Sequence, residues 1–257
     1  MISFKNITVE FGGLRAVDQT SFEIAAGHIT GLIGPNGAGK TTAFNVIAGH
    51  IRPNTGTVML NGLDITTLKP YQRSALGLAR TFQIAHEFSR LTVVENLMAA
   101  AASPIGENLL NVVFRRNVYE REELEHYAFA RETIQLLELD HLQDEKAGNL
   151  SGGQKKLVEL GRALMRNPKI ILLDEIGAGI NRTLLAKLAD KIKLLNQERG
   201  LTFCLIEHDL DYVSKLCDHV LVMAQGKLLT QGTVDQVRRD ERVIEAYFGG
   251  GKYEAHR

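Results

Sequence analysis

Cysteine is scarce in this sequence of 257 residues. The two that occur, Cys204 and Cys217, both lie in apolar segments. Two isolated cysteines supply neither the paired ligands of a structural metal site nor the framework of a disulfide-stapled domain. We therefore predict two reduced thiols that pack like small hydrophobic side chains.

An excess of charge and a long hydrophobic run are also lacking. The chain has 30 basic residues (lysine and arginine) and 30 acidic residues (aspartate and glutamate), so its formal net charge is zero. The whole chain therefore has no basic footprint for nucleic acid. No apolar run approaches the roughly 20 residues that span a bilayer. The N-terminal MISFKNITVEF alternates like a strand and does not resemble a signal peptide. We expect a cytosolic protein that reaches a membrane only through a partner.

The sequence does have the patterning of one large α/β domain, or of one domain with an inserted subdomain. Strand patterns recur in the first 86 residues and again from residue 167, where PKIILLDE has the continuous apolar character of a buried parallel strand. Residues from about 88 to 166 have helical periodicity and few strand signals. A helix from about Thr183 to Arg199 and a hairpin turning at Gln225-Gly226 are predicted beyond them.

A glycine-rich segment carries the first functional signal. GPNGAGKT, from Gly34 to Thr41, matches G-x-x-x-x-G-K-[ST] and lies between a predicted strand and a predicted helix. Its glycines let backbone N–H groups wrap phosphate oxygens, Lys40 reaches the terminal phosphates, and the Thr41 hydroxyl can ligate Mg²⁺. A chance glycine-rich turn would rarely combine the full pattern with these flanks, so we predict a nucleotide site.

Two carboxylates end the predicted strand IILLDE. Ligands of doubly wound sheets bind at the carboxyl ends of the strands. Asp174 is therefore the candidate Mg²⁺ holder, and Glu175 is the candidate base that polarises the attacking water. His208 ends a strand that we expect beside this one, where it can donate to the γ-phosphate. The alternatives are a solvated acidic pair and a structural histidine, and the phosphate loop disfavours them.

A second anion-binding pattern, LSGGQKK, occupies residues 150–156. Ser151 is a candidate N-cap, and the helix that follows would present backbone N–H groups and the positive end of its dipole. The chain already has a cradle for its own nucleotide. The pattern therefore raises the question of whose phosphate the second cradle holds.

The order of these motifs resembles the signature set of the ATP-binding-cassette (ABC) ATPases, over essentially the whole chain. The motifs are the phosphate loop, Gln83, LSGGQ, LLDE and His208. The resemblance implies a single domain with a RecA-like P-loop core and a small antiparallel β-subdomain, covering residues 1–86 and 167–257. It also implies a helical subdomain, covering residues 87–166, that carries LSGGQ.

The same resemblance implies hydrolysis of ATP to ADP and phosphate, with Mg²⁺, in a head-to-tail dimer. LSGGQ would then contact the γ-phosphate bound to the partner's Lys40 loop. The implied catalytic residues are Glu175, His208 and Lys40, and the implied metal ligands are Thr41, Gln83 and Asp174. The implied nucleotide contacts are Phe11, Gly34, Pro35, Asn36, Gly37, Ala38, Gly39, Lys40, Thr41, Thr42, Gln83, Ser151, Gly152, Gly153 and Gln154.

Some positions fit the family less simply. Phe11 fits the aromatic residue that stacks on adenine, but a core phenylalanine is a serious alternative. The segment from Ala178 to Asn181 fits the loop that crosses the dimer interface, with asparagine where many relatives have aspartate. Ile176 and Arg182 stand where the family usually has proline, which makes the loop after Glu175 less stiff.

Shorter phrases, including LARTFQ, IEHDLDYV and VIEAYFG, resemble the LivG-type ATPases of branched-chain amino-acid importers. This resemblance implies a second ATPase subunit, two membrane permeases, an external solute-binding protein, and a place on the cytoplasmic face of the inner membrane. Residues 88–94 would line the groove for a permease helix, or they simply pack in the helical core. The alternatives are a cassette for urea, an amide or an aromatic acid, a soluble cassette without a permease, and an ATP-binding switch with little turnover.

Overall fold

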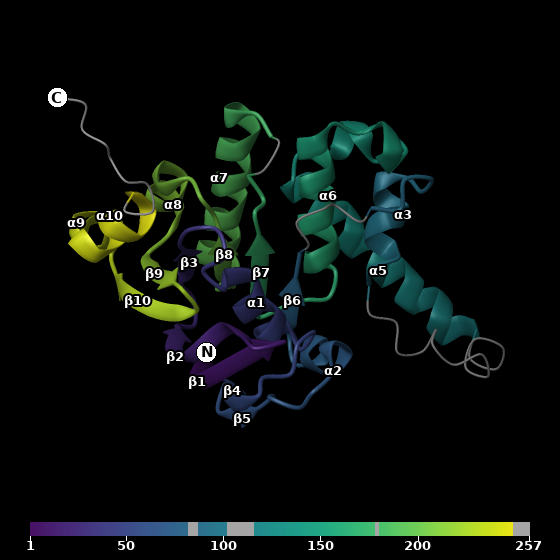
Figure 1. Ribbon diagram of the computed structural model, residues 1–257. Helices are drawn as coiled ribbons and strands as arrows, with labels where there is room; N and C mark the ends of the chain where they lie inside the picture. The colour runs from purple at the N-terminus through teal and green to yellow at the C-terminus, as the bar shows by residue number, and fades with distance from the viewer. Residues whose placement is uncertain (82–86, 102–115, 178–179, 249–257) are drawn as a thin grey trace. The chain divides into compact units, whose positions relative to one another are not determined.

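The computed structural model describes residues 1–81, 87–101, 116–177 and 180–248, and these form two compact units (Figure 1). The first unit contains residues 1–80, residues 169–176 and the described chain from Lys193 onward. The second unit contains the described residues of 81–168 and 177–192. Helix α7 (Arg182–Arg199) begins in the second unit and ends in the first.

A six-stranded sheet, in the order β10-β9-β3-β8-β7-β6, forms the centre of the first unit. Its strands are β3 (Ile29–Ile33), β6 (Leu78–Arg80), β7 (Ile170–Asp174), β8 (Thr202–Ile206), β9 (His219–Ala224) and β10 (Lys227–Gly232). All neighbours pair in parallel except β9 and β10, which form an antiparallel hairpin. Every residue of β3, β7 and β8 is buried, as strands covered on both faces require.

Different layers cover the two faces of this sheet. The helices of the first unit are α1 (Lys40–Ala48), α2 (Pro70–Ala75), α8 (Leu210–Leu216), α9 (Val234–Arg239) and α10 (Glu241–Phe248). Helix α1 shares one core cluster with Leu32 and Leu221, whereas α8, α9 and α10 share another with Ile33 and Val222. Because consecutive residues point to opposite faces of a strand, β3 and β9 contribute to both layers.

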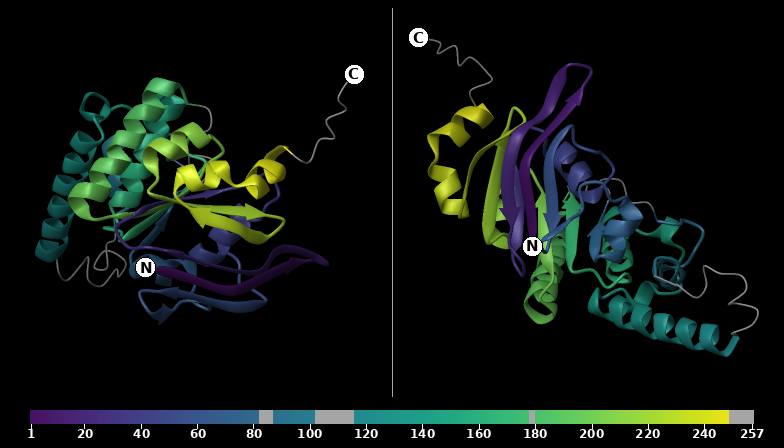
Figure 2. Two further views of the ribbon diagram at one scale, coloured as in Figure 1. Left: turned by 90° about the vertical axis from the view of Figure 1, so that its left-hand side faces the viewer. Right: turned by 90° about the horizontal axis from the view of Figure 1, so that it is seen from below.

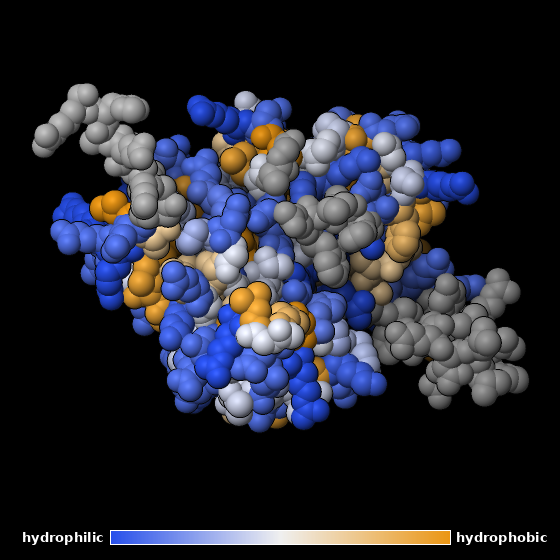
Figure 3. All heavy atoms as spheres, viewed as in Figure 1, coloured by the Kyte–Doolittle hydropathy of each residue, from blue (hydrophilic) through white to orange (hydrophobic). Residues whose placement is uncertain are grey.

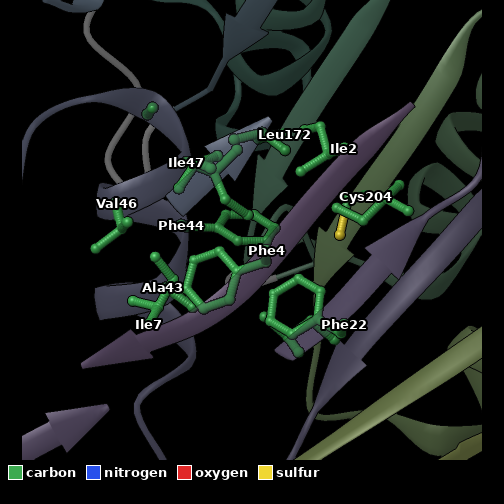
Figure 4. Packing of buried hydrophobic residues seen from close by; sticks show 14 of the residues in the cluster. Ile2, Phe4, Ile7, Phe22, Ala43, Phe44, Val46, Ile47, Leu172 and Cys204 are labelled. Carbon is green, nitrogen blue, oxygen red and sulfur yellow. The ribbon is translucent and has the colours of Figure 1, made fainter. Parts of the chain in front are cut away.

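A smaller antiparallel sheet, in the order β2-β1-β4-β5, packs on the α1 side. Its strands are β1 (Ile2–Phe11), β2 (Leu14–Ile24), β4 (Thr55–Leu60) and β5 (Leu63–Asp64). The rings of Phe4 and Phe22 stack with centroids 4.5 Å apart, and Phe44 of α1 joins the same cluster (Figure 4). The β1–β2 hairpin continues past the end of β4 to a turn at Gly12-Gly13, whose φ angles are 52° and 91° (Figure 2).

Helices make up most of the described part of the second unit. They are α3 (Val93–Met98), α5 (Arg116–Leu136), the 3-10 helices η1 (Asp140–Leu142) and η2 (Ala147–Asn149), α6 (Gly152–Leu164) and the first part of α7. A Cβ atom on Gly161 would lie 3.1 Å from Leu137 Cδ1 and 3.3 Å from Leu97 Cδ1. The glycine therefore lets α6 approach its neighbours closely.

These features confirm the predicted fold class, an α/β P-loop core with a small antiparallel sheet and a helical part. The predicted helix from about Thr183 is α7, and the predicted hairpin turns where Gln225 and Gly226 both have positive φ. Both cysteines are free thiols: Cys204 is buried within β8, and Cys217 is half-buried. Burial raises the pKa of both thiols above the ordinary value.

The face of the chain drawn in Figure 3 is mainly polar in its described residues. On the face drawn in Figure 3, hydrophilic residues predominate and hydrophobic ones form small separate patches. Among the described helices, none is both long enough and apolar enough to cross a bilayer.

Candidate active site

The phosphate loop connects β3 to α1 in the first unit, as predicted. Gly34, Gly37 and Gly39 have φ angles of 147°, 78° and 96°, a region that side chains rarely adopt. A Cβ atom on Gly34 would lie 2.0 Å from the Met223 carbonyl oxygen, and one on Gly39 would lie 2.3 Å from the Ala16 carbonyl oxygen. Gly34 and Gly39 are therefore needed both for backbone conformation and for close packing, whereas Gly37 is needed for conformation alone.

The loop presents an electropositive helix end. Helix α1 has no side-chain cap and no acidic residue in its first turn, so its first N–H groups are available to an anion. Lys40, 6% exposed, donates from Nζ to the carbonyl oxygens of Gly34 at 2.7 Å and Pro35 at 3.0 Å. Burial lowers the pKa of Lys40, and the charges of Glu175 and Asp174 oppose that shift. Asn36 and Ala38 lie between the glycines of the loop, and Thr41 and Thr42 follow Lys40 in the first turn of α1.

Asp174 and Thr41 provide the oxygen atoms that Mg²⁺ prefers. Asp174 is the last residue of β7 and is 3% exposed, and Thr41 is an exposed residue in the first turn of α1. A buried carboxylate beside a phosphate loop is costly unless a cation compensates it. Asp174 has such a partner in Arg80, whose Nη2 lies 2.8 Å from Asp174 Oδ2. Because a carboxylate and a hydroxyl are both oxygen ligands, Asp174 and Thr41 together fit a magnesium ion held with ATP.

Glu175 and His208 form a contact at the ends of two neighbouring strands. Strands β7 and β8 pair in parallel, with Asp174 opposite Ile206, which confirms that the two strands are adjacent. His208 Nε2 lies 2.8 Å from Glu175 Oε1, and the two side chains are 43% and 21% exposed. A carboxylate in contact with an imidazole, open to solvent, can accept a proton from water.

The backbone of Glu175 is unusual. Its φ angle is 49°, which is uncommon for a residue other than glycine and is typical of functional sites. Its N–H donates to the Ile206 carbonyl at 3.0 Å. The next residue, Ile176, is 4% exposed. Proline at that position would favour an extended backbone for Glu175, with φ near about −120°. The isoleucine that departs from the family pattern is therefore compatible with this conformation.

Phe11 is not a core residue, so that alternative is wrong. It ends β1 beside the Gly12-Gly13 turn and is 49% exposed. Leu14, which pairs with Phe11 across the hairpin, is 69% exposed. The hairpin tip therefore presents apolar side chains to solvent, as a base-stacking residue requires.

The signature segment begins α6 in the second unit. Ser151 is the N-cap and forms a capping box: Ser151 Oγ accepts from the Gln154 N–H at 3.4 Å, and the Ser151 N–H donates to Gln154 Oε1 at 2.9 Å. Gly152 is the first helical residue, and α6 has no acidic residue in its first turn. A Cβ atom on Gly153 would lie 1.8 Å from Leu184 Cδ2 of α7. The predicted N-cap is thus confirmed, and Gly153 is needed for packing.

Other predicted positions have mixed outcomes. Gln83 and Ala178 lie outside the described residues. Asn181 caps α7 by accepting from the Leu184 N–H at 2.9 Å, and Arg182 is the first residue of that helix. Within residues 88–94, Val93 is buried, whereas Phe88 is 49% exposed and lies under the Arg162 guanidinium at 4.9 Å.

Sequence reasoning missed two residues of the first unit. Arg80 ends β6 and bridges Asp174 and Asn45, a residue of α1. The arginine is visible in LARTFQ as a charged residue that ends an apolar strand, directly before the segment with Gln83. Nothing in the spacing points to Asn45, because the contact joins residues 35 positions apart.

Comparisons with known proteins agree with this geometry. The family model described as ABC transporter matches residues 17–178, and the one described as branched-chain amino acid ATP-binding cassette transporter matches residues 227–253. A probable branched-chain amino acid transport ATP-binding protein LivG of Archaeoglobus fulgidus is 39% identical over 249 residues, or 97% of this chain and 95% of its own.

Solved structures of ABC-transporter cassettes also superpose on this chain. A nucleotide-free ATP-binding cassette from an ABC transporter superposes with a TM-score of 0.85 at 39% identity, over 97% of this chain and 99% of its own. An ABC-transporter cassette in an ADP conformation superposes with a TM-score of 0.84 at 38% identity, over 97% and 98%. Because the first family model covers more than half of the chain and these relatives match nearly all of it, the chain belongs to the ABC transporter family, as one of its nucleotide-binding cassette ATPases.

Proposed function

We propose that this chain is the ATP-hydrolysing subunit of an importer for branched-chain amino acids. The observation that carries the proposal is the group of side chains at one edge of the β3-β8-β7 sheet: the Lys40 loop, Asp174, and the Glu175–His208 pair 2.8 Å apart. The solute is inferred from the names of the relatives and from the C-terminal match over residues 227–253. Solute contacts would lie in the permeases and the binding protein.

In the proposed reaction, Lys40 exchanges its bonds to the Gly34 and Pro35 carbonyls for bonds to phosphate oxygens. Glu175 accepts a proton from the attacking water as the water oxygen bonds to the γ-phosphorus and the bond from that phosphorus to the bridging oxygen breaks, which releases ADP. His208, which contacts the Glu175 carboxylate through Nε2 in this structure, donates toward the γ-phosphate. Magnesium, when bound, neutralises charge on the phosphates, and Thr41, Asp174 and Gln83 would hold it. Phe11, at the hairpin tip, supplies the stacking surface for adenine.

The second cradle acts on another subunit in this proposal. Two subunits pair head to tail, and Ser151, Gly152, Gly153 and Gln154 contact the γ-phosphate on the partner's Lys40 loop. Without ATP, two positive helix ends would face each other, so the anion is what stabilises the pair. This pair docks on two permeases at the cytoplasmic face of the inner membrane, and an external binding protein delivers the solute.

Mixing two inactive variants tests the shared site. Lys40→Ala removes the charge that holds the chain's own nucleotide, and Ser151→Arg blocks the cradle for the partner's nucleotide. The mixture contains pairs with one intact composite site, so ATP-driven association and some hydrolysis should return. If Ser151→Arg alone had wild-type turnover, the shared site would be refuted.

Reconstitution tests the transport role. The chain is placed in proteoliposomes with the permeases and binding protein encoded by neighbouring genes, and ATP hydrolysis is measured with leucine, urea, an amide and an aromatic acid. Stimulation by leucine supports the proposal, and stimulation by one of the others identifies another solute. Hydrolysis that no permease or solute alters would favour a soluble, non-transport cassette.

A further inference from the structure

A buried bridge connects the end of β7 to helix α1. Arg80 donates from Nη2 to Asp174 Oδ2 at 2.8 Å and from Nη1 to Asn45 Oδ1 at 2.5 Å. The side chains of Arg80 and Asp174 are 8% and 4% exposed. All three residues belong to the first unit, and each comes from a different element: β6, β7 and α1.

We propose that Arg80 is a positioning residue that fixes the Asp174 carboxylate for metal binding. The inference rests on the proposed function, in which Asp174 holds the magnesium ion. The guanidinium engages one carboxylate oxygen and is itself anchored on the helix that carries the phosphate loop. It thereby fixes the distance between the candidate metal ligand on β7 and the candidate ligand Thr41 at the start of α1.

The guanidinium has a shape that lysine lacks. Its planar fork reaches Asp174 with one nitrogen and Asn45 with another, whereas lysine has a single ammonium nitrogen and lacks this fork. Charge-assisted hydrogen bonds of this kind are directional as well as strong. Lysine at position 80 would keep the positive charge and lose the bridge, so it separates orientation from charge.

If the only role of Arg80 were to neutralise the charge of Asp174, the Arg80 variants would affect metal binding differently. If Arg80 only neutralised Asp174, then removing its charge in Arg80→Met would strengthen the attraction for a divalent cation, and Arg80→Lys would resemble the wild type. If Arg80 positions Asp174, both variants weaken metal binding. Loss of a group that orients a metal ligand typically lowers metal affinity about 10- to 100-fold.

The experiment measures Mn²⁺ binding by electron paramagnetic resonance, in the presence of the non-hydrolysable analogue AMP-PNP. We expect Arg80→Lys and Arg80→Met to weaken Mn²⁺ binding about 10- to 100-fold, and Asn45→Ala to weaken it less because one anchor remains. Binding of a fluorescent ATP analogue in EDTA should stay within about twofold of the wild type, which shows that each variant is folded. Arg52→Met, at an exposed arginine, is the matched control.

Two outcomes overturn the inference: wild-type Mn²⁺ affinity in both Arg80 variants, or tighter binding in Arg80→Met. If Arg80→Met does not fold, Arg80→Lys and Asn45→Ala decide the question. Asp174→Asn separates this inference from the proposed function. Unchanged Mn²⁺ affinity in Asp174→Asn would refute Asp174 as the metal holder, whereas weak binding there with normal binding in the Arg80 variants would refute only the role of Arg80.

Discussion

Replacement of Arg73 by methionine should destabilise the first unit severely. Arg73 lies in α2 and is 1% exposed. Its guanidinium donates to the carbonyl oxygens of Val46 and Ile47, near the end of α1, at 2.6 and 2.7 Å, and to those of Leu68 and Thr66 at 2.9 and 3.0 Å. One side chain therefore satisfies four backbone acceptors and closes the helix that begins with the phosphate loop.

The magnitude follows from these four bonds. A buried polar group left unsatisfied costs about 1–3 kcal/mol, so four of them set a gross loss of roughly 4–12 kcal/mol. Burial lowers the pKa of Arg73 to about 10, so removing the charge returns about 3 kcal/mol. Some carbonyls also keep other partners, and the expected net loss is about 4 kcal/mol. For a chain of this size, that loss lowers Tm by about 8–16 °C.

Thermal and urea unfolding monitored by circular dichroism measure the effect. Arg73→Lys keeps the charge but not the planar fork, so we expect about half the loss of Arg73→Met. Arg52→Met, at an exposed arginine, should change stability by less than about 0.5 kcal/mol. If Arg73→Met were as stable as Arg52→Met, the four hydrogen bonds would not contribute as argued.

Four further outcomes are expected. Glu175→Gln should keep ATP affinity and lose about 10²- to 10⁴-fold in turnover, with a dimer seen by light scattering in ATP and Mg²⁺; turnover at the wild-type rate would exclude Glu175 as the base. Ile176→Pro should lower kcat by about 5- to 150-fold through strain at Glu175, whereas Ile176→Val stays near the wild type; equal rates would disconnect that backbone from catalysis. Gly153→Ala should cost about 1–3 kcal/mol by crowding Leu184, and an unchanged Tm would contradict the packing. In a variant without the other cysteine, Cys204 should react with Ellman's reagent only upon unfolding, because burial raises its thiol pKa; rapid labelling of the native protein would disprove that burial.

Much of the fold could be predicted because local patterns and long-range packing agree. The apolar residues of IILLD lie in β7, a fully buried strand, and Gln225-Gly226 adopts the positive φ angles that a tight hairpin needs. The two sheets were harder to separate. Alternation predicts strands but does not say that β4 pairs with β1, since that pairing joins segments about 50 residues apart.

The site was predictable where a backbone motif dictates the chemistry, and unpredictable where a side chain reaches across the fold. Phosphate-loop glycines and the Ser151 N-cap act locally, so spacing was sufficient. Phe11 required the structure, because an aromatic residue near a strand end can point either way. Arg80 and Arg73 could not be found by pattern, since arginine is mostly exposed and its burial depends on acceptors from distant segments.

Helix α1 is held at three places, and this arrangement connects the two buried arginines to the site. Its first turn follows a glycine loop packed against the carbonyls of Met223 and Ala16. Its middle is tied through Asn45 and Arg80 to the carboxylate at the end of β7, and its end is closed by Arg73. A helix fixed at both ends and in the middle cannot shift without breaking charge-assisted bonds. We therefore expect the N–H groups at the start of α1, the Thr41 hydroxyl and the Asp174 carboxylate to keep one geometry before nucleotide binds, which is the preorganisation that phosphoryl transfer needs.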